Sequence, residues 1–323
     1  MEEDNMRGMF RAVLCCLAVL IVAPASAAEK LRVTKAVAFA WTFTPLDVGM
    51  QMGIFAKHGL EIEASAAAGD AKMQQALTAD STDVGIGSGP GMAFMTKGVP
   101  AKAVAVMYGV PKNMAVMVGY NSPAKTVDDL KGLKLGVTTV GSLTDWIGKR
   151  INNLKGWQGS TGITTVPIGG MPPARAAIKT NQLDGYIGAL EAGYALEEQK
   201  EWRVITGAAP FVDHFITHVF FVRQETIAKR PEVVRAFLRG WMETIAFMKA
   251  NKDKTVEITS KVVNIPPSVA ARAYDEQMSN FSLDGTFDPK ALAVLKQSFV
   301  DMGLLKDIPE NDVMFTTQFV PVK

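Results

Sequence analysis

The feature that most constrains the fold is a weak internal repeat at an offset of 101 residues. The repeat aligns Asp80 with Asn181, and both residue types tolerate the left-handed conformation that ends a helix. Each copy is predicted to run from a loop through a helix to a short buried strand, so the chain should fold into two similar α/β units. The identities appear when residues 59–88 are laid over 160–189, which aligns Gly69, Ala76, Asp83, Ile86 and Gly87 with Gly170, Ala177, Asp184, Ile187 and Gly188.

Strand-like and helix-like segments alternate over most of the chain, which favours helices layered on largely parallel sheets. We expect strands at 31–38, 61–66, 134–139 and 218–223, and helices that begin at Thr44-Pro45 and after Ser142. Beyond residue 223 the pattern becomes helical, with helices expected from Pro231, at 267–278 and at 289–302. This tail is predicted to pack on the first unit.

The first 27 residues are typical of a secretory signal peptide. Arg7 and Arg11 precede the apolar run 12–22, and the small residues 25–27 follow it. A bilayer-spanning helix needs about 20 apolar residues, so this shorter run is not expected to anchor the protein. We therefore expect cleavage after residue 27 and a periplasmic location. Whether translation starts at Met1 or Met6 stays open.

Composition excludes several classes of function. Cys15 and Cys16 are the only cysteines and lie in the predicted signal peptide, so disulfides, thiolate nucleophiles and cysteine-ligated metals are not expected. The chain after residue 27 has 32 basic and 29 acidic residues, which is too balanced for a nucleic-acid-binding protein. The spacing of four between His214 and His218 could suit a metal on a helix, but residues 215–217 between them are strand-like, which would hold the two side chains too far apart to share one. We therefore expect no metal, no cofactor and no nucleic acid.

A family resemblance rests on short stretches spread over nearly all of the chain after the signal peptide. They are Pro45-Leu46, 52–55, 58–62, 77–83, 129–132, 135–137 and 182–185. Together they resemble the nitrate/sulfonate/taurine and thiamine-precursor (pyrimidine) binding proteins of ABC importers, and the related fungal pyrimidine synthases. The resemblance implies a type II periplasmic-binding-protein fold, in which two α/β lobes joined by a hinge close on a ligand cleft. We expect lobe 1 to contain 28–115 plus 219–323, and lobe 2 to contain 116–218.

This sequence departs from the family in two ways. Asp80 and Asn181 stand where the family often has glycine, which leaves the fold unaffected because both residues adopt positive φ at modest cost. The cysteine-rich motif of the fungal synthases has no counterpart here, which argues against an enzyme.

The ligand is expected beyond the carboxyl ends of the strands, where helix amino ends present free N–H groups. Six loops meet this condition: 40–44, 69–70, 87–89, 140–144, 169–171 and 190–191. Glycine in most of them permits close backbone approach. The candidate ligand-binding residues are Trp41, Thr42, Gly69, Ser88, Gly89, Gly141, Ser142, Gly170 and Glu191 in these loops, with Tyr108 and His214 beside the expected lobe crossings.

Each polar or aromatic candidate has a structural alternative. Trp41 could cover a planar ligand or pack in the core. The hydroxyls of Thr42, Ser88 and Ser142 could contact a ligand, cap a helix, or do both. Glu191 could receive an amine or ring N–H of the solute, or simply stabilise a helix start. The hypothesis of one binding cleft requires these hydroxyls and Glu191 to converge on a shared cavity.

The sequence therefore predicts a monomeric substrate-binding component of an ABC importer, without catalytic residues, that presents its solute to an inner-membrane permease. Two alternatives remain: an exported enzyme on the same fold that acts on a pyrimidine-like compound, with His214 or Glu191 as acid or base, and a ligand-sensing subunit of a receptor. The identity of the solute stays open. Helix starts rich in glycine favour a sulfonate, nitrate or carboxylate, whereas Trp41, Tyr108 and Glu191 favour an aromatic, pyrimidine-type or amine-bearing solute.

Overall fold

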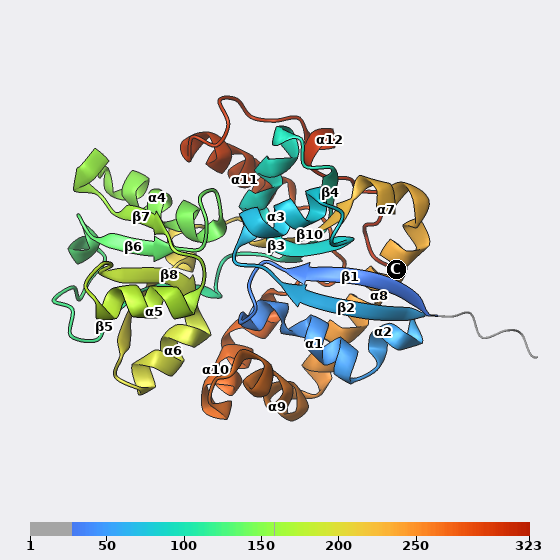
Figure 1. Cartoon of the computed structure of the whole chain (residues 1–323), viewed down its shortest axis with the longest axis horizontal. Helices are drawn as coiled ribbons and strands as arrows, with labels where there is room; N and C mark the ends of the chain where they lie inside the picture. The colour runs from blue at the N-terminus through green and yellow to red at the C-terminus, as the bar shows by residue number, and fades with distance from the viewer. Residues whose placement is uncertain (1–27, 158) are drawn as a thin grey trace, which may run out of the picture.

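The computed structural model describes residues 28–157 and 159–323, which form two α/β lobes that lie beside each other (Figure 1). The predicted two-lobed α/β fold is confirmed. The predicted signal peptide, with both cysteines, lies outside the described residues.

Each lobe is built on one five-stranded sheet. The sheet of the first lobe has the order β2 (Leu60–Ala66), β1 (Glu29–Lys35), β3 (Val84–Ser88), β10 (His218–Arg223) and β4 (Ala101–Tyr108). The sheet of the second lobe has the order β7 (Thr164–Pro167), β6 (Lys134–Val137), β8 (Gly185–Ala189), β5 (Met114–Gly119) and β9 (Trp202–Gly207).

The two sheets have the same topology, and each takes one strand that the chain delivers from the other lobe. β1 pairs in parallel with β2 and β3, as β6 does with β7 and β8. The fourth strand of each sheet, β10 or β5, is antiparallel to both of its neighbours. Because β5 follows β4 and β10 follows β9, the chain crosses between the lobes in the segments 109–113 and 208–217.

The sequence repeat occupies equivalent places in the two lobes. Asp80 and Asn181 both have positive φ, 55° and 57°. The Asp83 carboxylate accepts the Arg32 backbone N–H at 3.0 Å, and the Asp184 carboxylate accepts the Lys134 backbone N–H at 2.8 Å. In each lobe the repeated aspartate therefore fastens the turn after a helix to the strand at the centre of the parallel group.

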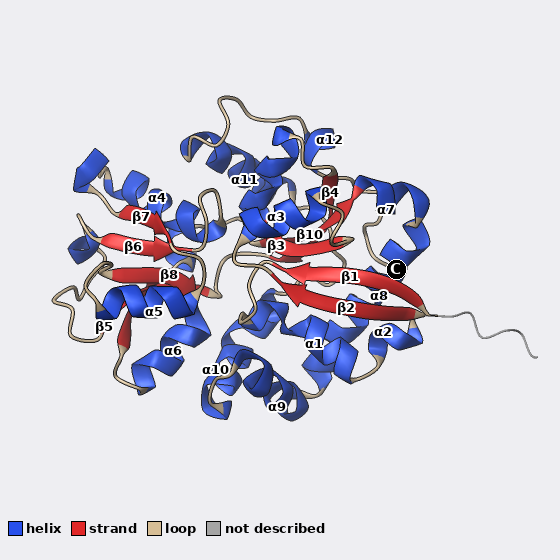
Figure 2. Cartoon of the chain, in the orientation of Figure 1, coloured by secondary structure: helices blue, strands red, loops and turns tan. Residues whose placement is uncertain are grey.

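Helices lie on both faces of each sheet (Figure 2). Those of the first lobe are α1 (Thr44–Gln51), α2 (Ile54–Lys57) and α3 (Asp70–Thr78), and those of the second are α4 (Leu143–Lys155), α5 (Met171–Lys179) and α6 (Leu190–Glu198). The tail contains α7 (Gln224–Lys229), α8 (Pro231–Ala250), α9 (Lys252–Val263), α10 (Pro267–Gln277), α11 (Pro289–Asp301) and α12 (Asn311–Met314). The 3₁₀ helices are Trp41–Phe43, Gly89–Lys97, Asp128–Leu130, Gly159–Thr161, Ala209–Phe211 and Met278–Asn280.

Local sequence signals account for several of these helix boundaries. The Ser142 hydroxyl accepts the Asp145 N–H at the start of α4, and Gly156 ends the helix with φ of 66°. Helix α8 starts at Pro231, as predicted, and buries one apolar face that includes Trp241 and Phe237. Helix α9 was not predicted: the tail helices that were predicted, α8, α10 and α11, each begin at a proline, whereas α9 begins at Lys252.

The tail packs on the first lobe, where α8 contacts α1 and α2, and it also contacts the second lobe. Ala195 of α6 shares a buried apolar cluster with Val269 and Ala270 of α10. On the other side of the molecule the Lys149 ammonium of α4 donates to the Met302 carbonyl just after α11, at 3.4 Å. The tail therefore links the lobes in addition to the two chain crossings.

We predict that Asn181→Gly leaves the free energy of unfolding unchanged or slightly raised, whereas Asn181→Ala lowers it by about 1 kcal/mol. A Cβ is strained in the left-handed region, and alanine lacks the local polar contacts that help asparagine there. Urea denaturation followed by tryptophan fluorescence measures both changes. The matched control is the exposed helical Asn153, where glycine should destabilise by a few tenths of a kcal/mol up to about 1 kcal/mol. A loss of stability in Asn181→Gly as large as in Asn153→Gly would contradict the interpretation.

Candidate ligand-binding cleft

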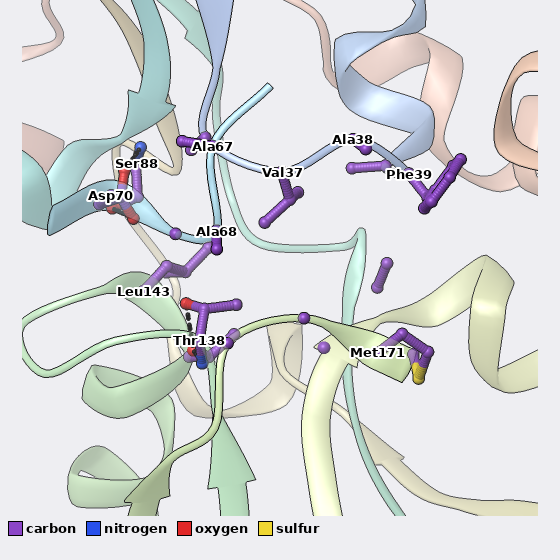
Figure 3. A pocket seen from close by; sticks show the side chains of 18 of the residues that line it. Val37, Ala38, Phe39, Ala67, Ala68, Asp70, Ser88, Thr138, Leu143 and Met171 are labelled. Atoms are coloured by element: carbon purple, nitrogen blue, oxygen red, sulfur yellow. Dashed lines mark hydrogen bonds between the residues drawn. The ribbon is translucent and has the colours of Figure 1, made fainter. Parts of the chain in front are cut away.

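A cavity of about 340 Å³ lies between the lobes, at the carboxyl ends of the parallel strands. Both lobes contribute to its wall, as Figure 3 shows with Val37 and Ala68 from one side and Thr138 and Met171 from the other. Its lining comprises 36–40, Thr42, Phe43, 67–70, Ser88, Asn113, Met114, Thr138, Leu143, Thr144, 168–173, Tyr186, Gly188, Ala189 and His218. This is the position at which open α/β sheets bind ligands.

Five of the six loops proposed from the sequence contribute lining residues. Loop 190–191 does not, although Ala189 immediately before it does. Of the individual candidates, Thr42, Gly69, Ser88 and Gly170 line the cavity. The lining does not include Trp41, Gly89, Tyr108, Gly141, Ser142, His214 or Glu191. The expected convergence of the three hydroxyls and Glu191 on one cavity is therefore wrong for Ser142 and Glu191, which are buried outside the lining.

Most of the wall is apolar. Segment 36–40 follows β1 and contributes small or apolar side chains, and Ala67 and Ala68 follow β2. The Phe39 side chain is 53% exposed, and Figure 3 places it and Met171 at the same end of the cavity, from opposite lobes. These two side chains are positioned to cover a solute between them.

On the first-lobe side, Asp70 and Ser88 form a buried polar pair. Asp70 is the first residue of α3, and its carboxylate accepts the backbone N–H and the hydroxyl of Ser88, each at 2.8 Å. The Ser88 hydroxyl oxygen also accepts the Gly91 N–H at 3.3 Å, as a helix cap. Burial raises the pKa of Asp70, and the bonds from Ser88 oppose this. The hydroxyl of Ser88 is thus held by the protein.

Ser142 belongs to a hydroxyl cluster at the start of α4. Thr138 donates to the Ser142 hydroxyl at 2.9 Å, and the Thr138 backbone N–H donates to Thr144 at 2.9 Å. Leu143 and Thr144 face the cavity, whereas Ser142 is buried behind them. Gly141 has φ of 76°, and a Cβ there would lie 3.1 Å from the side chain of Leu304.

Trp41 and Glu191 meet behind the cavity wall and join the two lobes. The backbone N–H of Trp41 donates to the Glu191 carboxylate at 2.7 Å, and the Gln277 amide approaches the other oxygen at 3.5 Å. Glu191 is 1% exposed, and burial raises its pKa. The Trp41 ring is fully buried and lies 5.3 Å from the Phe281 ring, between centroids. Tertiary contacts thus place both side chains between the second lobe and the tail.

The remaining candidates also lie outside the cavity lining. Tyr108 is fully buried and donates to the Gln277 carbonyl at 3.2 Å; burial raises its pKa. His214 is exposed on the segment that connects β9 to β10. Gly89 packs against that segment so closely that a Cβ would lie 1.9 Å from the Ile216 carbonyl oxygen. Close backbone packing therefore accounts for this glycine.

Asn113 and His218 were not among the predicted site residues. Both line the cavity where a lobe crossing meets a strand, and each has a polar atom that is unpaired among the described residues. Asn113 precedes β5 and is 3% exposed, and His218 begins β10 and is 5% exposed. Within the described part of the chain, neither Asn113 Oδ1 nor His218 Nδ1 has a hydrogen-bond partner. Burial lowers the pKa of His218 to about 3, so the ring is neutral near pH 7. Their place at the starts of strands that follow lobe crossings was the signal available in the sequence.

Among residues 28–157 and 159–323, no three His, Asp or Glu side chains come together in a way that could hold a metal ion. None of the helices described has both the length and the apolar character that crossing a membrane requires.

Comparison with known families decides the relationship of the chain. The family described as NMT1/THI5 like matches residues 41–255, about two thirds of the sequence. The chain belongs to the NMT1/THI5-like family. The match extends from Trp41 through both lobes and into α9, so it includes every loop that lines the cavity except the residues just before Trp41.

Individual proteins are similar to this NMT1/THI5-like chain in sequence or in fold. A protein of Brucella abortus (strain 2308) that is named a binding protein is 27% identical over 234 residues, which cover 70% of this chain and 69% of the relative. The alkanesulfonate-binding protein SsuA of Xanthomonas axonopodis pv. citri, solved with bound MOPS, superposes with a TM-score of 0.75 at 16% identity, covering 92% of this chain and 98% of the other. A Candida albicans protein described as having the generic periplasmic binding protein fold gives 0.73 at 17% identity, with coverage of 88% and 93%.

We predict that His218 makes the protein less stable in acid. Its folded-state pKa of about 3 is below the value of about 6.5 expected in the unfolded chain, so below pH 6.5 the unfolded chain binds a proton that the folded chain does not. The free energy of unfolding contributed here should fall by up to about 1.4 kcal/mol per pH unit as the pH drops from 6.5 towards 3. His218→Gln should remove this component from urea denaturation curves measured between pH 7 and pH 4. His214→Gln, at an exposed position, is the control and should keep the wild-type slope.

We predict that Glu191→Ala lowers the free energy of unfolding by about 1–3 kcal/mol, because it leaves the buried Trp41 N–H without its acceptor. Glu191→Gln retains an acceptor and should cost less. Since burial raises the folded-state pKa of Glu191, stability from this group is greatest in acid and is lost as the pH rises from the ordinary value towards the raised one. Glu191→Gln should therefore compare more favourably with wild type at pH 8 than at pH 4. Equal losses for the two variants at both pH values would contradict this role.

Proposed function

We propose that the protein is an exported solute-binding subunit of an ABC importer, which captures a small solute between its lobes and releases it to a permease. The observation that carries this proposal is the cavity lined by both lobes at the carboxyl ends of their strands. Its volume of about 340 Å³ suits a small molecule. Membership of the NMT1/THI5-like family and the fold shared with SsuA support the same function.

Capture by lobe closure follows from how the lobes are joined. The crossings at 109–113 and 208–217 have few residues, and a hinge absorbs its motion in such short segments. At the cavity rim the lobes touch, since a Cβ on Gly69 would lie 2.6 Å from the Thr139 side chain. A solute that contacts both walls would stabilise the closed arrangement, and a permease would recognise the joined outer surface.

We infer that the solute leaves unchanged. Ser88 and His218 pair across β3 and β10 and both face the cavity, which resembles a nucleophile and base. The Ser88 hydroxyl, however, donates to Asp70 and is not directed at the imidazole. The chain beyond residue 27 also has no cysteine. The amino-terminal segment typical of a signal peptide supports export, which would place the protein where an importer collects its solute.

We predict that a bulky side chain in the cavity abolishes solute binding without unfolding the protein. Ala68→Phe should do so, because Ala68 lines the cavity and is exposed enough to accept a ring. The measurement is a thermal-shift screen with taurine, nitrate, benzoate, benzamide and cytosine, followed by calorimetric titration of every probe that raises Tm. A probe at 100 times its Kd should stabilise the wild type by about 2.7 kcal/mol.

The matched control is Ala56→Phe, at an exposed position of α2 away from the cavity, which should bind as the wild type does. Binding should be one to one, and the recovered probe should be chemically unchanged. A screen in which no probe stabilises the wild type, or in which Ala68→Phe responds as strongly as Ala56→Phe, would contradict the proposal.

A further inference from the structure

The chemistry of the cavity wall restricts the class of solute. Asp70, Tyr186 and His218 are the titratable side chains among the lining residues, which include neither lysine nor arginine. Tyr186 donates its hydroxyl to the Gly169 carbonyl at 3.1 Å, and burial raises its pKa, so it is neutral. An anionic solute would therefore find no cationic side chain in the lining, and only backbone amides and neutral side chains such as Thr42 and Asn113 could donate to it.

Three helices that start beside the cavity carry an acidic side chain in their first turn. Helices α3, α4 and α6 carry Asp70, Asp145 and Glu191 in their first turns, and all three carboxyl groups are buried. A carboxylate in the first turn offsets the positive end of the helix dipole. These acidic side chains therefore offset the partial positive charge that would otherwise attract an oxyanion.

Helix α5 lacks two of the amide donors that a helix start normally has. Pro172 and Pro173 occupy its second and third positions, and proline has no backbone N–H. Both line the cavity, where they present apolar rings in place of two of the donors that a helix start normally offers. The second-lobe wall is thus shaped for apolar contact at the point where an oxyanion would be expected to bind.

The Asn113 amide lines the cavity with an oxygen that the described residues leave without a hydrogen-bond partner. The Asn113 amide is buried, its Oδ1 is unpaired within the described residues, and its Nδ2 has only contacts of 3.5 Å to Thr42 and to Met114. A side-chain amide offers one acceptor beside one donor in either flip. Its complement is a donor and an acceptor side by side, as in a carboxamide or a lactam. The neutral imidazole of His218 adds a further unpaired Nδ1.

We infer, on the basis of the proposed function, that the solute is uncharged and largely apolar, and that an amide-like edge of it pairs with Asn113. The wall disfavours anions because it has no lysine or arginine, because acidic side chains stand in the first turns of α3, α4 and α6, and because two prolines stand in that of α5. The unpaired buried amide then sets the polar recognition, and the apolar wall around 36–40 and 168–173 takes the rest of the molecule.

The test compares probes that share a ring and differ in charge. Benzamide and cyclohexanecarboxamide should bind the wild type at least about tenfold more tightly than benzoate, cyclohexanecarboxylate and benzenesulfonate, by calorimetric titration. Affinity for the carboxamides should be unchanged between low and high salt, since screening acts on charged ligands. Tighter binding of the anions, weakened by salt, would overturn the inference.

Asn113→Leu keeps the size of the side chain and removes both polar atoms. It should weaken carboxamide binding by about tenfold or more, and Asn153→Leu, on the exposed face of α4, should not. Equal carboxamide affinities in wild type and a folded Asn113→Leu would overturn the assignment of Asn113. Asn113→Asp retains two acceptors without the donor, and it keeps the test informative if the leucine variant does not fold.

These outcomes separate the inference from the proposed function. If anions bind in the wild type and Ala68→Phe abolishes their binding, the cavity still captures solute but of the other charge class. If no probe of either class binds in a manner that Ala68→Phe abolishes, the proposed function itself is wrong.

Discussion

The exchange of one strand between the two lobes is the constraint on which the rest of the structure depends. β10 completes the first sheet and β5 the second, and each arrives antiparallel to the strand beside it. A chain that is paired in both sheets cannot let the lobes separate, yet its crossings leave them free to approach. The carboxyl ends of the parallel strands then face one another, and the cavity forms between them.

Buried polar groups decide how that cavity is lined. Asp70 and Glu191 lie at helix starts, where a free carboxylate is favoured, yet each is also removed from water, which raises its pKa. Each is held by N–H or O–H donors from another part of the chain, Ser88 for the first and Trp41 for the second. The carboxyl groups of Asp70 and Glu191 thus rigidify the site and also make it less favourable for an anion.

The sequence predicted much of the fold because its signals were local. The cap at Ser142, the stop at Gly156 and the positive φ of Asp80 and Asn181 all depend on residues within one or two turns. Helix α9 was missed because, unlike α8, α10 and α11, it does not begin at a proline, and it packs on α1 and α10. The lining loops were predictable in outline, since strand ends in an α/β sheet converge on one edge.

By itself, the sequence determined that two repeated α/β units form and that their strand-end loops line a cleft, because periodicity, caps and left-handed stops act over a few residues. Only the tertiary structure decided which side chains face the cleft. Glu191 turns away to Trp41, and Asn113 and His218 turn in, because their partners are 86 or more residues distant or absent among the described residues. Contacts at that separation follow from how the lobes pack, which no local pattern encodes.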